Sequence, residues 1–196
     1  MRCLLSLSLA FFIFAICGFN AGAERLGGAR LGPARGVACS LPPRGPDSST
    51  SAIQHDERFV AREHFKEDIR PGAHVRISWL GATFVRRFAS KVEAARDTSL
   101  QTFVLQSPSN DREIITELGD GHETTLADVW CLLRLQASGE PGALQTNSTP
   151  NIFFVRDGAG QPGVVDAIWG GAGWEIGASP VGDKRAWSVG TRVISR

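Results

Sequence analysis

Strand-like alternation of apolar and polar positions is clearest in the last third of the chain. Runs with strong β propensity are separated there by short segments rich in Gly, Pro and Asp, residues that accept the backbone angles of tight turns. The runs are NIFFVR (151–156), GVVDAIW (163–169), WEIGAS (174–179) and AWSVGTRVIS (186–195). Because short links place successive strands antiparallel, the pattern predicts a four-stranded antiparallel meander.

Apolar residues recur at helical spacing in two segments before this meander. Residues 56–69, DERFVAREHFKEDI, place charges between apolar positions and are followed by Pro71, so they predict an amphipathic helix with His64 facing solvent. Residues 125–137 continue an apolar helical face from Thr125-x-x-Asp128, a variant of the capping box, in which each of the two side chains bonds the other residue's backbone N–H. We therefore expect a second amphipathic helix that begins after Thr125.

Residues 74–106 allow two interpretations. HVRISWL (74–80) alternates as a strand, residues 82–97 have a helical stripe, and LQTFVLQ (100–106) is again strand-like, which gives a strand-helix-strand unit. The alternative is a hairpin that turns at Gly81. In both, either Trp79 or Leu80 points inward. Together the segments predict a small single α+β domain with two or three amphipathic helices packed on one face of the meander.

The first residues have the pattern of an export signal. Arg2 precedes an apolar run over residues 4–17, and Ala21-Gly22-Ala23 offers small residues for cleavage after Ala23. The run is shorter than the roughly 20 residues that span a bilayer, so we expect no stable transmembrane span after cleavage. Residues 24–52 are rich in Gly, Pro and Arg and predict a flexible linker, which leaves residues 53–196 as the globular domain.

Charge and cysteine content refine this organisation. The leader, residues 1–23, holds one of the 21 basic residues and none of the 20 acidic ones, so the rest is formally neutral, which argues against nucleic acid as a partner. Two of the four cysteines, Cys39 and Cys131, lie outside the leader. An even number in an exported protein allows a disulfide, whereas the apolar helical surroundings of Cys131 also suit a free buried thiol. We expect a periplasmic or secreted protein.

The segment ELGDGHETTLADVW (117–130) has the densest group of candidate catalytic residues. His122 could act as a general base oriented by Asp120 or Glu123. A zinc-protease motif requires a second histidine four positions after His122, and that position is Leu126, so no metal site is expected. Because the motif is incomplete, we interpret the segment as a turn and helix start, and we expect no cofactor.

Tryptophan usage leaves two interpretations open, and the sequence favours a role in the core over one in binding. The chain has five Trp and no Tyr, and Trp169 and Trp174 flank one predicted hairpin turn. Exposed, the two rings would suit a sugar or a peptide; facing each other, they would seal the core. The sequence therefore favours an exported, non-catalytic binding or structural module whose partner is a cell-wall sugar, a peptide or an envelope protein. The alternative is a small secreted or periplasmic hydrolase that uses His122 with Asp120 or Glu123.

Overall fold

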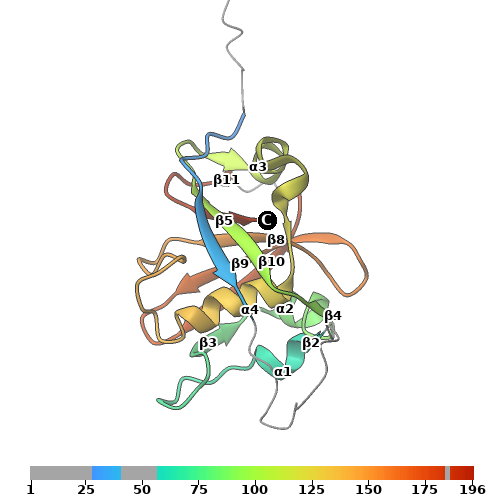
Figure 1. Ribbon diagram of the computed structural model, residues 1–196, viewed down its shortest axis with the longest axis vertical. Coiled ribbons are helices and arrows are strands. Elements are labelled where there is room, and N and C mark those ends of the chain that lie inside the picture. Colours follow the sequence, from blue (N-terminus) through green and yellow to red (C-terminus); the bar gives the residue numbers. More distant parts are fainter. Residues whose placement is uncertain (1–27, 41–56, 184–185) are drawn as a thin grey trace, which may run out of the picture.

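The protein is built around one large mixed β-sheet with short helices against it (Figure 1). The computed structural model describes residues 28–40, 57–183 and 186–196. Eight strands form the main sheet: β1 (Arg35–Cys39), β3 (Ile77–Leu80), β5 (Thr98–Val104), β7 (Glu123–Thr124), β8 (Asn151–Arg156), β9 (Pro162–Trp169), β10 (Trp174–Pro180) and β12 (Arg192–Ser195). Their order is β1-β5-β12-β8-β9-β10-β3, and β7 adds to β8.

Short elements surround this sheet. Two strand pairs lie outside it: β2 (Glu57–Val60) with β4 (Val92–Ala95), and β6 (Ser109–Asn110) with β11 (Ala186–Trp187). The α-helices of the described part are α1 (Ala61–His64), α2 (Ala82–Arg87), α3 (Asp111–Leu118) and α4 (Leu126–Leu135). The predicted α+β fold, with helices packed on a four-stranded meander, is therefore wrong: most elements are strands, and the sheet is larger and mixed.

The C-terminal strands show where that prediction failed. β8, β9 and β10 pair antiparallel in sequence order, as the turn-rich links predicted. The predicted fourth strand, residues 186–195, instead splits into β11 and β12, and β12 runs parallel to β8 on the side away from β9. There it also pairs antiparallel with β5. The last strand thus closes the gap between the two halves of the sheet rather than extending a meander.

The central strand β8 is buried on both faces of the sheet. Phe153 and Val155 belong to the larger core, which includes the apolar side of α4. Ile152 and Phe154 belong to a smaller core on the opposite face, together with Ile114 of α3. Helices therefore pack on both faces, which explains why the sequence of β8 is a continuous apolar run rather than an alternation.

The segment predicted as the first helix forms a strand and a single helical turn. Phe59 pairs with Glu93 in the β2–β4 ladder, and α1 begins only at Ala61. His64, expected to face solvent, stacks on Phe59 with ring centroids 4.4 Å apart and contacts Trp130. Pairing with a strand distant in sequence has overridden the local helical pattern. Residues 74–106 form β3, α2, β4 and β5, so neither proposed arrangement is complete.

Part of the predicted linker belongs to the sheet. β1 pairs antiparallel with β5 over its whole length, from Arg35 opposite Thr102 to Cys39 opposite Thr98. A disulfide then joins Cys39 to Cys131 of α4, with the Cα atoms 6.0 Å apart. The flexible-linker prediction is therefore corrected for residues 28–40. The predicted signal peptide, residues 1–23, and the rest of the linker lie outside the described residues.

Candidate functional site

Two polar residues of segment 117–130, Thr125 and Asp128, form the start of α4. The Thr125 hydroxyl accepts a hydrogen bond from the Asp128 backbone N–H at 3.2 Å, and the Asp128 carboxylate accepts one from the Thr125 backbone N–H at 2.8 Å. The capping box predicted from the sequence is confirmed. These bonds satisfy backbone groups that have no partner within the helix itself.

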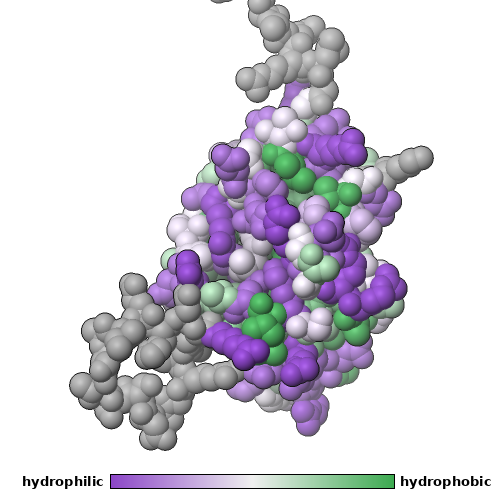
Figure 2. Space-filling model, turned by 90° about the vertical axis from the view of Figure 1, so that its right-hand side faces the viewer, coloured by the Kyte–Doolittle hydropathy of each residue, from purple (hydrophilic) through white to green (hydrophobic). Residues whose placement is uncertain are grey.

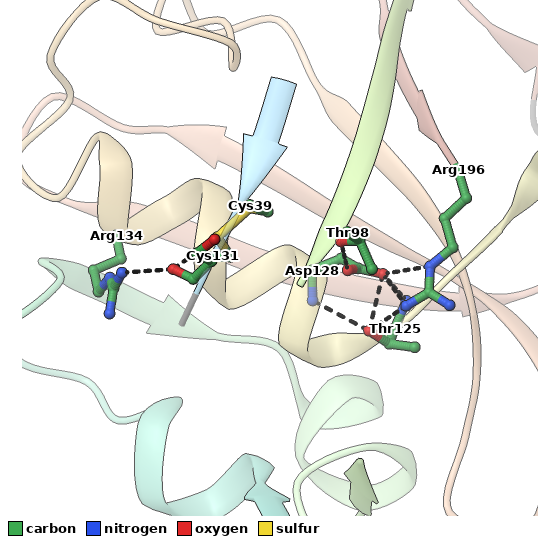
Figure 3. Close-up of a disulfide and its surroundings, with 8 residues drawn as sticks. Cys39, Thr98, Thr125, Asp128, Cys131, Arg134 and Arg196 are labelled. Atoms are coloured by element: carbon green, nitrogen blue, oxygen red, sulfur yellow. Dashed lines mark hydrogen bonds and ion pairs between the residues drawn. A yellow bond between two sulfur atoms is a disulfide. The ribbon is translucent and has the colours of Figure 1, made fainter. Parts of the chain in front are cut away.

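Asp128 also connects α4 to two distant parts of the chain (Figure 3). The Thr98 hydroxyl of β5 donates to one carboxylate oxygen at 2.8 Å. The Arg196 guanidinium donates to the other, with a closest approach of 2.8 Å, and the Asp128 side chain is only 3% exposed. Both oxygens are therefore occupied, so this carboxylate has a structural role.

The sequence-predicted catalytic residues do not form one hydrogen-bonded group. His122 ends the short 3-10 helix η1 (Gly119–His122), and its Nδ1 lies 2.7 Å from the Gly119 carbonyl oxygen. Both carboxylate oxygens of Glu123 accept hydrogen bonds from Arg156 Nε, and Asp120 is exposed. No hydrogen bond in the described part joins Asp120 or Glu123 to His122. The pocket beside His122 has a volume of about 30 Å³, room for about one water molecule.

The two tryptophans predicted to bind a ligand lie at the helix-covered face of the sheet. Trp174 is completely buried, and its indole N–H donates to the Gln136 carbonyl at 3.0 Å. Trp169 is half-buried and packs edge-on against Trp174, with centroids 5.4 Å apart. The pair closes the large core, so the two rings do not form an exposed platform.

Trp79 is the exposed tryptophan of the described part, with 51% of its surface accessible. Its direction results from an irregularity in the parallel β3–β10 ladder: Ile77 lies opposite Trp174, but Trp79 lies opposite Glu175. Ser78 is the extra residue, and the Ser78 hydroxyl donates to the Trp174 carbonyl. Such a bulge re-aims the following side chains. Trp79 therefore points away from the large core, whereas Leu80 packs against it.

A row of three side chains crosses the sheet at this point, and we call it the Trp79 face: Trp79, Glu175 and Ile168. Glu175 lies directly opposite Trp79 on one side and Ile168 on the other. Residues directly opposite each other in neighbouring strands point to the same face. The row thus presents an aromatic ring, a carboxylate and an aliphatic side chain over neighbouring strands.

The polar groups of the Trp79 face have no partners among the described residues. No hydrogen bond or ion pair engages the Glu175 carboxylate or the Trp79 indole N–H there. Asp68, which bridges to β3 at Ile77, differs: hydrogen bonds from the Arg70 side chain and backbone lower its pKa to about 2. Unlike Asp68, Glu175 therefore has both carboxylate oxygens available to accept hydrogen bonds from a ligand.

Two glycines give the Trp79 face its shape. A Cβ atom at Gly81 would lie 2.9 Å from Cη2 of the Trp79 ring, and one at Gly170 would overlap the Glu175 carboxylate. Each side chain therefore lies over a position without a side chain. This close packing restricts the directions in which the ring and the carboxylate can point before a ligand binds.

The Trp79 face could not be predicted from the sequence, because strand alternation alone does not reveal a bulge. The pattern HVRISWL left Trp79 or Leu80 as the inward residue, and the bulge at Ser78 decides for Leu80. The available signals were a tryptophan two residues before a turn glycine, Gly81, and a charged residue at the second position of WEIGAS. Neither specifies which strands become neighbours, so the row could not be assembled from the sequence.

The described residues contain neither a cluster of metal ligands nor a membrane-spanning helix. No three His, Cys, Asp or Glu side chains of this part gather as they would around a metal ion. None of its helices is long and apolar enough to cross a membrane. Hydrophobic groups on the surface in Figure 2 form separate small patches among polar side chains.

Comparison of the chain with protein-family models, curated proteins and solved structures finds no match.

Proposed function

We propose that this protein is an exported, non-catalytic binding module that holds a saccharide on the Trp79 face. The observation that carries the proposal is the exposed Trp79 ring beside the unpaired carboxylate of Glu175, directly opposite each other on adjacent strands. The sheet and the disulfide supply a fixed support for this small surface. Its ligand is a sugar of the cell envelope or the extracellular space.

The chemistry of the Trp79 face suits a neutral ligand with many hydroxyl groups. The indole ring offers an apolar surface to the C–H face of a sugar ring, and its N–H is a donor. Glu175 supplies acceptor oxygens for sugar hydroxyls, and Ile168 extends the apolar contact. A cationic ligand would use the ring and the carboxylate but not the indole donor. The combination of donor and acceptor therefore favours a saccharide.

The disulfide supports the exported location of this module. Disulfides form and persist in oxidising compartments, which include the periplasm and the extracellular space. Cys39 and Cys131 are both buried and join β1 to α4. A periplasmic or secreted protein accounts for this bond, and the predicted leader supplies the route of export.

Binding to oligosaccharides tests the proposal. Purified protein is titrated with oligomers of N-acetylglucosamine and of glucose, and with tetralysine as a cationic probe, by isothermal titration calorimetry. We expect binding of one oligosaccharide, at least tenfold weaker for Trp79→Ala and weaker for Glu175→Gln. Leu135→Ala is the matched control, because Leu135 is 55% exposed on α4, away from the Trp79 face. It should bind as the unmodified protein does.

Four results would contradict the proposal. Binding of tetralysine alone would show that the Trp79 face recognises cations. No binding of either oligosaccharide series, or a loss as large in Leu135→Ala as in Trp79→Ala, would remove the sugar assignment. Release of new reducing ends from a bound oligosaccharide, abolished by His122→Ala, would show that the protein is a hydrolase.

A further inference from the structure

Two arginines share one face of the sheet at the ends of β1 and β12. Arg35 lies opposite Thr102 of β5, and Thr102 lies opposite Ile194 of β12. Opposite residues point to the same face, and so do residues two apart in a strand. Arg192 is two positions from Ile194, so Arg35 and Arg192 point to the same face, which is the face of the larger core.

The surroundings of these two guanidinium groups leave their charge uncompensated. Arg192 is half-buried; its Nη1 donates to the Ala143 carbonyl at 2.5 Å, while its Nε is buried without an acceptor. Arg35 is exposed, and its side chain has no partner in the described part of the chain. No carboxylate of that part forms an ion pair with either residue. Burial, and then repulsion by Arg35, lower the pKa of the Arg192 guanidinium.

We propose that Arg35 and Arg192 form a binding site for a dianionic phosphate group. Two guanidinium groups match the charge of such a group, and each presents N–H donors in the planar arrangement that binds phosphate oxygens. A bound phosphate would supply the negative charge that the described residues do not offer and would offset the repulsion between the two cations. The site is separate from the Trp79 face and does not depend on saccharide binding.

The phosphate group could belong to a lipid or to a soluble molecule, and a thermal melt followed by vesicle sedimentation separates the two. Purified protein is melted in increasing inorganic phosphate and, at the same ionic strength, in chloride; it is then sedimented with vesicles of phosphatidylcholine with or without phosphatidic acid. We expect inorganic phosphate to raise the Tm beyond the chloride effect, because a ligand of the folded state stabilises it by mass action. Sedimentation only with phosphatidic acid would identify a lipid phosphate as the natural source, and its absence a soluble one.

Charge-matched variants decide whether the effect belongs to this site. Arg35→Gln should abolish the phosphate-specific rise in Tm and should raise the Tm in low-salt, phosphate-free buffer, because the repulsion is gone. Arg192→Gln should also abolish the rise, but it loses the bond to Ala143, so Arg35→Gln is the decisive variant. Arg112→Gln is the control, an exposed arginine on α3. Equal Tm values in phosphate and chloride, or equal losses in Arg35→Gln and Arg112→Gln, would overturn the proposal.

Discussion

Two carboxylates of this protein have opposite surroundings. Asp128, at the start of α4, is buried and accepts hydrogen bonds from Thr98, Thr125 and Arg196. Glu175, on β10, is exposed and accepts none from the described residues. A helix start requires acceptors for its free N–H groups, which explains the positions of Thr125 and Asp128. Asp128, which belongs to the segment with the candidate catalytic residues, thus has a structural role, while a carboxylate without a partner among the described residues lies on a strand.

The difference extends to the regions around the two residues. The α4 anchor, which we define as Cys39, Thr98, Asp128, Cys131 and Arg196, joins β1, β5, α4 and the end of β12 by a disulfide and buried polar bonds (Figure 3). The Trp79 face has no such links. Substitutions in the anchor should therefore reduce stability, and substitutions in the Trp79 face should reduce binding.

Removing the disulfide should have the largest effect on stability. The bond closes a separation of 92 residues, and bonds over loops of this size stabilise small proteins by roughly 2–5 kcal/mol. The double variant Cys39→Ala, Cys131→Ala should unfold at a Tm lower by on the order of 10 °C. Dithiothreitol should lower the Tm of the unmodified protein similarly and leave the variant unchanged. A variant as stable as the oxidised protein would show that β1 is not held by this bond.

Asp128→Asn should have the second largest effect. The amide keeps the shape but loses the charge and one acceptor oxygen, so Arg196 and part of the helix cap lose their partner. Leaving buried polar groups unsatisfied costs roughly 1–3 kcal/mol, and the outer end of Arg196 is partly screened by water, so the low half of that range is expected. Urea denaturation measures the loss. An unchanged midpoint would contradict the structural role assigned to Asp128.

A third carboxylate, that of Asp157, should make the stability of the folded protein depend on pH. Burial raises its pKa, but hydrogen bonds from the Arg87 side chain and from the backbone of Gln161 and Ala159 outweigh this effect, so the folded-state pKa lies below its ordinary value of 3.8. A depressed folded pKa stabilises the protein above the unfolded-state pKa, and that contribution is lost as the pH falls through the folded one. Asp157→Asn should therefore show a weaker decrease in stability below about pH 4.

The measurement for Asp157 is the free energy of unfolding as a function of pH, from urea titrations between neutral pH and the acid range. Arg87→Met serves as the companion variant, because it removes the ion pair but keeps the Asp157 carboxyl group. It should lose stability at neutral pH and should also flatten the acid dependence. An acid dependence identical in all three proteins would show that other groups determine it.

Local signals in the sequence were sufficient for some elements. Thr125 and Asp128 marked the start of α4, and the turn-rich links identified β8, β9 and β10 with their antiparallel order. In each case the information lies within a few residues of the element. These elements were predicted because capping and short connections depend on neighbouring positions only.

The remaining elements depend on partners far along the chain. β12 returns to pair parallel with β8, and β1 pairs with β5 although its sequence resembles a linker. Phe59 has both helical spacing and strand propensity, and β4 decides between them. The Trp79 face depends on a bulge between β3 and β10. Alternation and spacing carry no information about such pairings, so these features required the structure.

The smallest effect on stability is expected at the Trp79 face. Glu175→Gln removes a charge that forms no bond in the described part, so the free energy of unfolding should change by less than about 0.5 kcal/mol. Trp79 is half-exposed, so Trp79→Ala should cost about 1 kcal/mol through lost apolar burial. Urea denaturation beside Asp128→Asn compares the same carboxylate-to-amide change in both regions. If Glu175→Gln is as destabilising as Asp128→Asn, Glu175 has a structural partner and is not free for a ligand. If the Glu175→Gln variant keeps its stability but binds sugar weakly, the α4 anchor serves stability and the Trp79 face serves recognition.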